Sequence, residues 1–323
     1  MYKGKPDNGS YWLQLARFEN DLGNSKEAIR ILEKQSRNIK FQEKALNKLA
    51  TLYFQAKQFD KSLDAVSRSL KNNRLDVQAI ELKFQNLVAL GKLADAKHQI
   101  NILQGLGTTD EYKLLKLSRM LQQVKEFQSA DNNLTQALEL APDNITILID
   151  SIKLKIRLND YKGASYLLNK AKQTQYTGDI RLLILSGDIA FAKNNKQQAF
   201  NYYQQALKQD KANTIALVKL AQTSTTPSLS EQFIKQLTAL VNEFPHRNFQ
   251  QHTLADHLMV NKKYNLAKYQ YQLLLTKAIP TNKRAVALNN LANIYIIEKD
   301  FASAVEFATQ ALAIVKAEAA IVD

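Results

Sequence analysis

The stretch EYKLLKLSRMLQQVKEFQSADNNLTQALELAPDN, residues 111–144, decides the fold class because it contains two helical patterns in succession. In its first half, apolar or small residues recur at i, i+3, i+4 and i+7, namely Leu114, Leu117, Ser118 and Leu121. In its second half a facing stripe is formed by Phe127, Ala130, Leu134, Ala137 and Leu138. Pro142 lacks the backbone N–H that a helix interior needs, so the second helix ends before it. The stretch predicts two amphipathic helices joined by a short turn.

The same pattern recurs along the chain with a period near 34 residues. A position in the second helix is small in eight of nine copies: Ala28, Ser62, Ala96, Ala130, Ala164, Ala199, Phe233, Ala267 and Ala304. Twelve residues earlier, most copies again carry a small residue: Ala16, Ala50, Phe84, Ser118, Ile152, Gly187, Ala221, Ala255 and Ala292. Small side chains let two helix axes approach closely, so we expect the two helices of each copy to cross at these positions.

The composition agrees with a wholly helical chain. Of 323 residues only 9 are Gly and 5 are Pro, too few for the many turns of a β-sandwich or barrel. An apolar content of 45% suffices for a core and excludes the disordered class. Cysteine is absent, which excludes disulfides, thiolate metal sites and thiol nucleophiles. No apolar run is long enough for a transmembrane segment, and none is expected.

The repeat resembles the tetratricopeptide repeat, whose signature is W-x2-L-G-x2-Y, then A-x3-F, then P. The matching residues are Trp12-x2-Leu15-Ala16, Leu46-x2-Leu49-Ala50-x2-Tyr53, Leu288-x2-Leu291-Ala292-x2-Tyr295, Ala199-x3-Tyr203, Ala267-x3-Tyr271, Pro142 and Pro245. This resemblance implies an all-α fold, a right-handed α–α superhelix of about nine helix-turn-helix units over residues 9–318. The units are expected to start near residues 9, 43, 77, 111, 145, 180, 214, 248 and 285. Residues 1–8 are expected to be a polar leader, and 319–323 the truncated start of a further repeat.

Two units depart from the pattern. The unit 145–179 has Ile152 and Lys155 where the family prefers small and aromatic residues. The unit 214–247 has Phe233 in place of the usual Ala, and an unusual turn between its helices, Thr223–Ser230, which contains Pro227. We still expect two well-formed helices in the unit 214–247.

Candidate chemistry is sparse. His252 and Asp256 have the i, i+4 spacing of a two-ligand metal face, but a third ligand on that face is missing, so no metal site is expected. No phosphate-binding glycine loop or nucleophile elbow occurs, and the repeats use every stretch long enough for a catalytic domain. The sequence therefore predicts a protein that is not an enzyme and has no cofactor.

The resemblance implies that fixed positions of each first helix point into a concave groove that binds a partner. In the N-terminal copies these positions hold Arg17, Lys44, Asn47, Lys48, Gln85, Lys116, Arg119, Lys153, Arg157 and Arg181. In the C-terminal copies they hold, among others, Phe191, Phe249, His252, Met259, Asn289, Asn290 and Asn293. One part of the groove is thus predicted to be basic, and the other apolar with a cluster of Asn.

The expected function is that of a protein-interaction scaffold whose partner is a protein or peptide, acidic or extended, since the net charge is +14. A helical-repeat RNA reader and a binder of anionic polysaccharide remain alternatives, although the inward positions vary too much between Leu, Lys, Asp and Val for an RNA code. Residues 285–314 also resemble bacterial tetratricopeptide lipoproteins of exopolysaccharide and protein-sorting systems. That resemblance implies an envelope assembly and a periplasmic or outer-membrane-associated location; without it, a cytoplasmic one is expected.

Overall fold

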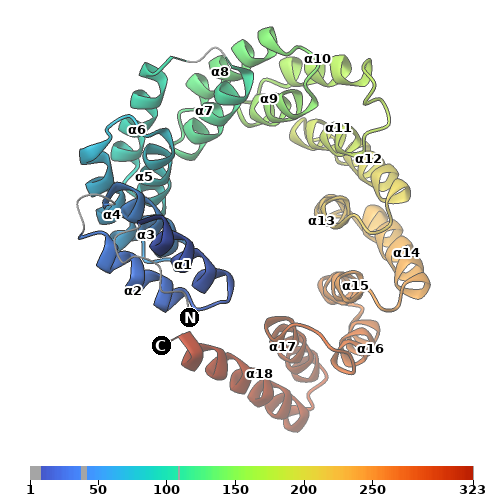
Figure 1. Cartoon of the computed structure of the whole chain (residues 1–323). Helices are drawn as coiled ribbons and strands as arrows, with labels where there is room; N and C mark the ends of the chain where they lie inside the picture. Colours follow the sequence, from blue (N-terminus) through green and yellow to red (C-terminus); the bar gives the residue numbers. More distant parts are fainter. Residues whose placement is uncertain (1–8, 38–41, 108–109, 323) are drawn as a thin grey trace. The chain divides into compact units, whose positions relative to one another are not determined.

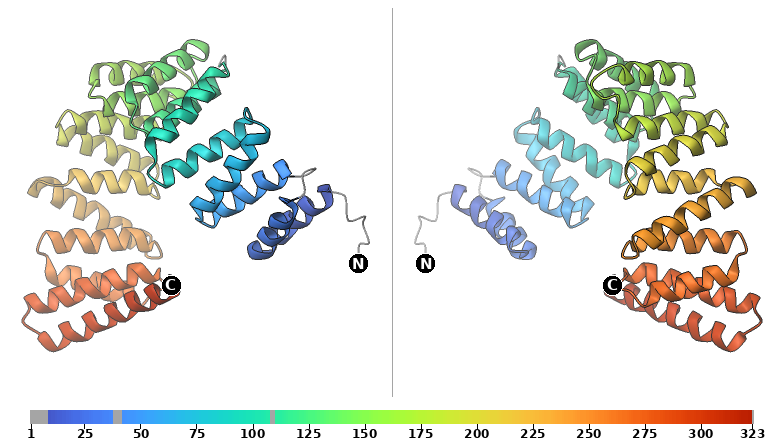
Figure 2. Two further views of the ribbon diagram at one scale, coloured as in Figure 1. Left: turned by 90° about the vertical axis from the view of Figure 1, so that its left-hand side faces the viewer. Right: turned by 90° about the vertical axis from the view of Figure 1, so that its right-hand side faces the viewer.

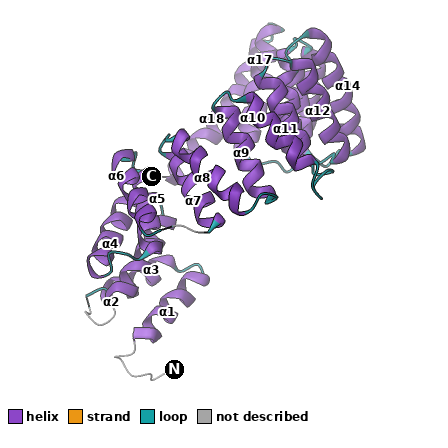
Figure 3. Cartoon of the chain, turned by 90° about the horizontal axis from the view of Figure 1, so that it is seen from above, coloured by secondary structure: helices purple, strands orange, loops and turns teal. Residues whose placement is uncertain are grey.

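The computed structural model describes residues 9–37, 42–107 and 110–322, and every regular element in these ranges is an α-helix (Figure 3). The predicted all-α, helical-repeat fold is confirmed. The chain divides into two compact units, one ending at Leu158 and the other beginning at Asn159. The expected leader, residues 1–8, lies outside the described residues.

The first unit is a stack of helical hairpins. Its helices are α1 (Gly9–Asp21), α2 (Ser25–Gln35), α3 (Gln42–Gln55), α4 (Phe59–Asn72), α5 (Val77–Ala89), α6 (Leu93–Gly105), α7 (Glu111–Gln123), α8 (Phe127–Leu140) and α9 (Ile145–Arg157). Each odd-numbered helix up to α7 packs against the next helix, and each even-numbered helix packs against the first helix of the following hairpin. The odd-numbered helices therefore lie along one side of the stack (Figure 1).

The second unit is built in the same way. Its helices are α10 (Tyr161–Lys172), α11 (Ile180–Ala192), α12 (Lys196–Gln209), α13 (Thr214–Thr223), α14 (Pro227–Glu243), α15 (Asn248–Val260), α16 (Tyr264–Leu275), α17 (Thr281–Ile297) and α18 (Phe301–Val322). The hairpins α11–α12, α13–α14, α15–α16 and α17–α18 follow one another, as the two side views show (Figure 2). The division of residues 9–318 into nine repeat units stays a prediction.

The small residues of the 34-residue period lie at the helix crossings, as predicted. All nine members of the series from Ala28 to Ala304 are at most 5% exposed, and eight of them are fully buried at 0%. In the partner series Ala16, Ala50, Ser118 and Ala255 are equally buried. The close approach is tightest at Gly187, where an added Cβ would lie 2.3 Å from Cε1 of Tyr203. In the hairpins that lie within one unit, the period thus marks the contact between the two helices.

A residue in the left-handed backbone conformation follows the first helix of nearly every hairpin. Sequence reasoning did not predict these helix caps. At the ends of the first helices, positive φ angles occur at Gly23, Lys57, Gly91, Lys125, Asn159, Asn194, Lys262 and Lys299. The residue that follows donates its N–H far back into the helix: Gln58 to the carbonyl of Tyr53 at 2.8 Å, and Glu126 to that of Leu121 at 2.9 Å. These are the bonds of a Schellman cap, which satisfies the last carbonyls of the helix.

The hairpin α13–α14 has no such cap and uses another turn. Its two helices are well formed, as expected, but the turn is shorter than the stretch Thr223–Ser230 predicted from the sequence. The side chain of Thr226 accepts the N–H of Leu229 and caps α14, whose first residue is Pro227. Proline is favoured at this first helical position because its missing N–H has no partner there. The residues 227–230 therefore belong to the helix.

At the other end of the chain, α18 continues without a turn through residues 319–322. These residues were expected to begin a further repeat, but the sequence from Phe301 to Val322 holds no Gly, Pro or Asn that would end a helix. They extend α18, and residue 323 lies outside the described residues.

Enlarging a crossing residue tests this packing. Ala130 is fully buried on α8, so Ala130→Leu should overpack the α7–α8 crossing and cost about 1–3 kcal/mol of unfolding free energy. Asn132→Leu, on the exposed side of the same helix, is the control and should change stability little. Chemical denaturation followed by circular dichroism measures both; equal stabilities of the two variants would contradict the placement of Ala130.

Candidate functional site

The first helices of unit 1 enclose a groove, which we call the N-terminal groove. A cavity of about 520 Å³ lies between α1 and α3, and a second of about 240 Å³ continues it toward α5. Both are lined by Leu13, Lys44, Lys48 and Thr51, so they form one depression across α1, α3 and α5. Leu32 and Leu52 add apolar surface to the first cavity, and Gln14, Asn20 and Gln55 add amide groups.

Three cations surround this groove. Arg17 makes only a loose pair with Asp21, at 3.7 Å between its Nε and the carboxylate oxygen, and both side chains are largely exposed. Lys44 and Lys48 are exposed and have no carboxylate within 4 Å among the described residues. Asn47 donates its amide to Asp76 at 2.9 Å, so that carboxylate is engaged within the protein. The N-terminal groove therefore presents unneutralised positive charge beside an apolar floor.

A second basic depression, the α7–α9 site, has a volume of about 350 Å³. It is lined by Arg119, Gln122, Gln123, Asp150, Lys153 and Arg157. Arg119 donates from Nε to Asp150 at 2.6 Å, which neutralises one of the three cations. The guanidinium of Arg157 lies 5.1 Å from the ring centre of Phe127, a cation–π contact that holds it in place. Lys153 is exposed and has no carboxylate partner among the described residues.

The structure brings together seven of the ten basic or polar residues predicted for the first part of the groove. Arg17, Lys44, Asn47 and Lys48 line the N-terminal groove, and Arg119, Lys153 and Arg157 line the α7–α9 site. Gln85 lies exposed on α5. Lys116 is bound to Glu81 at 2.5 Å, and Arg181, in unit 2, to Asp179 at 2.5 Å. These two cations are held by internal carboxylates and contribute little free charge.

In unit 2 two of the three predicted apolar residues are exposed, and the predicted polar residues are partly exposed and partly buried. Phe191 and Phe249 are 43% and 38% exposed, and Met259 is half-buried. Asn289 and Asn293 are exposed on α17. Asn290 instead turns inward and donates to the hydroxyl of Tyr271 at 2.9 Å. The predicted Asn cluster is therefore divided between the surface and the core.

His252 does not face an open groove, which corrects the prediction. It is 8% exposed, its Nδ1 lies 2.9 Å from Asp256, and its ring meets the ring of Tyr271 edge-on. Tyr271 in turn donates its hydroxyl to Asp256 at 2.7 Å. The i, i+4 pair of His252 and Asp256 is thus part of an internal network, and no group of three metal-ligating side chains occurs in the described part of the chain.

Tyr203 and Tyr271 are core residues, as their place in the period predicts. They are 2% and 0% exposed, and each donates to a carboxylate fifteen residues earlier, Asp188 at 2.6 Å and Asp256 at 2.7 Å. Burial, together with the adjacent carboxylate, raises the pKa of both hydroxyls. Both remain protonated donors and are not stacking surfaces for bases.

Among the described residues, no helix combines the length and the apolar character required to cross a membrane.

Sequence reasoning missed Leu13, Thr51 and Gln122 as groove residues, although they share a helix face with predicted ones. The signal was available, because Leu13 lies four residues from Arg17, Thr51 three from Lys48 and Gln122 three from Arg119, so each missed residue shares a helix face with a predicted one.

Two segments match models of a known family: residues 180–213 and residues 284–318 both match the tetratricopeptide repeat. The chain contains tetratricopeptide repeats. The first matched segment begins where a repeat was predicted to begin, at Ile180, and the second includes most of α17 and α18.

Solved tetratricopeptide structures and other helical proteins share the fold. A tetratricopeptide repeat protein from Parabacteroides merdae aligns with a TM-score of 0.59 at 13% identity, covering 77% of this chain and 98% of that one. Yeast Tom70 aligns with a TM-score of 0.54 at 15% identity, covering 93% and 67%. PilW, a type IV pilus biogenesis factor, aligns with a TM-score of 0.51 at 17% identity, covering 66% and 98%. At these identities the likeness shows the fold alone.

A curated relative is similar in sequence over a shorter stretch. The ancillary SecYEG translocon subunit of Haemophilus influenzae is 31% identical over 98 residues, which cover 29% of this chain. The match spans 47% of that protein, about half its length.

Proposed function

We propose that this protein is a non-catalytic scaffold whose first unit binds an extended, acidic segment of a partner protein. The tetratricopeptide repeat fold supports a protein-interaction scaffold. The observation that carries the acidic specificity is the pair Lys44 and Lys48, exposed beside a cavity of about 520 Å³ and without a carboxylate partner among the described residues.

The groove suits a peptide that carries both charged and apolar side chains. Carboxylates of the ligand form charge-assisted hydrogen bonds with Arg17, Lys44 and Lys48. The apolar floor of Leu13 and Leu52 receives an aliphatic or aromatic side chain between them. A uniformly charged polymer would leave that floor unoccupied, which favours a protein ligand over an anionic polysaccharide.

The two basic depressions define the length of the ligand. The N-terminal groove centres on α3, and the α7–α9 site lies between α7 and α9, two to three hairpins further along the same unit. At about 9 Å per hairpin, the two sites are separated by about 18–27 Å. An extended chain covers about 3.3 Å per residue, so about six to eight residues connect them. The proposed ligand carries two acidic clusters at that separation, one for each site.

Binding of labelled peptides tests the proposal. The double variant Lys44→Glu, Lys48→Glu should bind an acidic, extended peptide at least tenfold more weakly, about 1.4 kcal/mol. Lys71→Glu on α4 carries the same kind of charge change on a second helix and should leave the affinity unchanged. Fluorescence anisotropy at two salt concentrations measures the affinities, and circular dichroism verifies that the variants fold.

Competing ligands give distinct results in the same assay. Tighter binding of single-stranded RNA of defined sequence than of the peptide would contradict the proposal and favour an RNA reader. Equal competition by an anionic polysaccharide with no apolar groups would show that charge alone is recognised. Equal loss of peptide binding in the Lys71→Glu variant would point to net charge and away from the groove.

We also propose that the partner is a component of a bacterial envelope assembly and that the protein acts in the periplasm or at the outer membrane. Similarity to a protein named as an ancillary translocon subunit supports a membrane-associated assembly. Cross-linking in the native host followed by mass spectrometry tests the setting. Cross-links confined to cytoplasmic proteins would overturn it and leave the groove proposal standing.

A further inference from the structure

A further cavity of unit 1 lies at the junction of α5, α6 and α7, and we call it the α5–α7 pocket. Its volume is about 250 Å³, and its walls are mainly apolar: Val77 of α5, Leu103 and Leu106 at the end of α6, and Leu117 and Met120 of α7. Leu103, Leu117 and Met120 are buried, whereas Val77 and Leu106 are 45% and 41% exposed. The pocket therefore has an apolar interior and an apolar rim.

The packing of α6 leaves this space open. The helix α6 packs less extensively on α7 than α4 does on α5 or α8 does on α9. Gly107, just beyond the end of α6, lines the pocket, and an added Cβ there would meet no atom of the described residues within 4 Å. The junction therefore has room for a side chain that the helices around it do not supply.

The α5–α7 pocket lies between the two basic depressions of unit 1. On α5, Glu81 lines the pocket, and Gln78, three residues earlier, lines the N-terminal groove. On α7, Lys116 lines the pocket, and Arg119, three residues later, lines the α7–α9 site. Residues three apart are neighbours on one face of a helix. A segment that runs from one basic depression to the other therefore passes the pocket.

An internal ion pair joins α5 and α7 beside the pocket. Lys116 binds Glu81 at 2.5 Å, and only 20% of the Glu81 side chain is exposed. Lys113, exposed on α7, adds a second cation to the lining. The one carboxylate among the lining residues is thus neutralised, and an acidic segment can approach the pocket without charge repulsion.

We propose that the α5–α7 pocket receives one large apolar side chain of the partner segment, a Leu, Met or Phe that stands between its two acidic clusters; this inference rests on the proposed function. The volume is below the range of about 300–1,000 Å³ for drug-sized ligands, so it suits a single side chain. A polar side chain would lose its hydration between the apolar walls without gaining a hydrogen bond there.

The position of the pocket places the apolar residue within the segment. The pocket lies one to one and a half hairpins from each basic depression, about 9–14 Å at about 9 Å per hairpin. An extended chain covers that distance in about three or four residues. The recognised pattern is therefore an acidic cluster, an apolar residue three or four positions later, and a second acidic cluster after the same interval.

Fluorescence anisotropy with a matched pair of labelled peptides tests this specificity. Both peptides carry two acidic clusters about seven residues apart, and the residue midway is leucine in one and serine in the other. The leucine peptide should bind about tenfold more tightly, because its side chain leaves water for an apolar pocket. A third peptide, with the leucine moved next to one cluster, should bind like the serine peptide.

Variants of the pocket wall assign the gain to this cavity. Leu106→Gln makes the rim polar and Val77→Phe fills the interior, and each should lower the affinity for the leucine peptide to that for the serine peptide. Leu140→Gln is the matched control: it lies 34 residues after Leu106, is 54% exposed and does not line the pocket, so the preference should persist. Circular dichroism verifies that all three variants fold.

The results separate this inference from the proposed function. Equal binding of both peptides, with loss of both in the variant Lys44→Glu, Lys48→Glu, would leave the groove proposal standing and refute the apolar anchor. A leucine preference that survives in Leu106→Gln and Val77→Phe would place the anchor elsewhere and refute it as well. If neither peptide binds, the proposed function fails, and the anchor fails with it.

Discussion

Replacing Gly187 with alanine is expected to destabilise the second unit by about 3 kcal/mol, the upper part of the range for overpacked cores. The new Cβ would lie 2.3 Å from Cε1 and 2.6 Å from Cδ1 of Tyr203, well inside van der Waals contact. The ring cannot move away easily, because Tyr203 is 2% exposed and its hydroxyl is bound to Asp188 at 2.6 Å. The helices α11 and α12 are therefore so close at Gly187 that there is no room for a methyl group between them.

Chemical denaturation measures this effect, and the chain supplies a matched control. At Gly178, in the same unit, an added Cβ meets no atom within 4 Å, so Gly178→Ala should be close to neutral. Adding Tyr203→Leu to Gly187→Ala removes the clashing ring and should recover part of the loss. Equal stability of Gly187→Ala and the unmodified protein would show that α11 and α12 do not cross at this residue.

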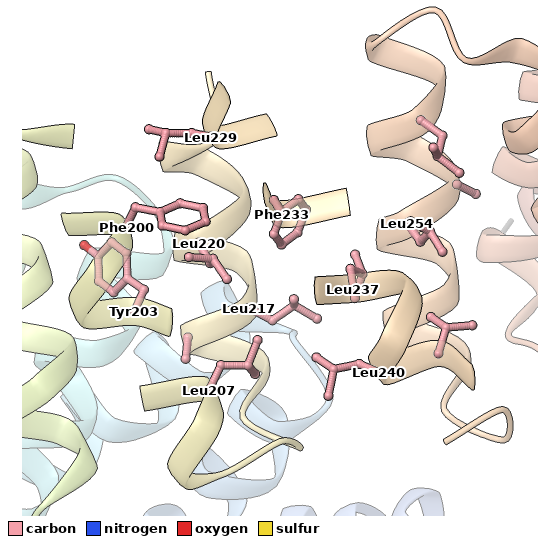
Figure 4. Packing of buried hydrophobic residues seen from close by; sticks show 14 of the residues in the cluster. Phe200, Tyr203, Leu207, Leu217, Leu220, Leu229, Phe233, Leu237, Leu240 and Leu254 are labelled. Atoms are coloured by element: carbon pink, nitrogen blue, oxygen red, sulfur yellow. The ribbon is translucent and has the colours of Figure 1, made fainter. Parts of the chain in front are cut away.

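Replacing Phe233 with alanine is expected to cost about 3–5 kcal/mol, although alanine stands at this position in seven of the other eight hairpins. Phe233 is fully buried in the cluster that contains Leu220, Leu237 and Leu254 (Figure 4). Its ring also meets that of His257 edge-on, with centres 4.7 Å apart. The surrounding residues fit the large ring, so the residue typical of the repeat would leave a cavity here.

The control is a phenylalanine on the surface of the same unit. Phe191 is 43% exposed, and Phe191→Ala should cost much less than Phe233→Ala in the same denaturation experiment. If Phe233→Ala were as stable as Phe191→Ala, α13 and α14 would have to move together and fill the space.

The helices could be predicted because their signal is local. Apolar and small residues at helical spacing define each face, and the period of about 34 residues locates the crossings from Ala28 to Ala304. The ends of the first helices were harder, because four of the left-handed caps are lysines, Lys57, Lys125, Lys262 and Lys299, and lysine carries no turn signal. There the residue after each lysine donates its N–H five residues back into the helix, which fixes the left-handed conformation.

The sequence by itself determined where the amphipathic helices lie, since a helical face depends only on spacing. The resemblance to the tetratricopeptide repeat implied which residues of the first helices point into a groove. Tertiary structure alone decided which of them are free to bind. Lys44 and Lys48 have no carboxylate nearby among the described residues, while Lys116 and Arg119 are bound to Glu81 and Asp150. Such pairs join residues 31 or 35 positions apart on neighbouring hairpins, so they depend on how one hairpin is rotated and offset against the next. No local pattern in the chain specifies that rotation.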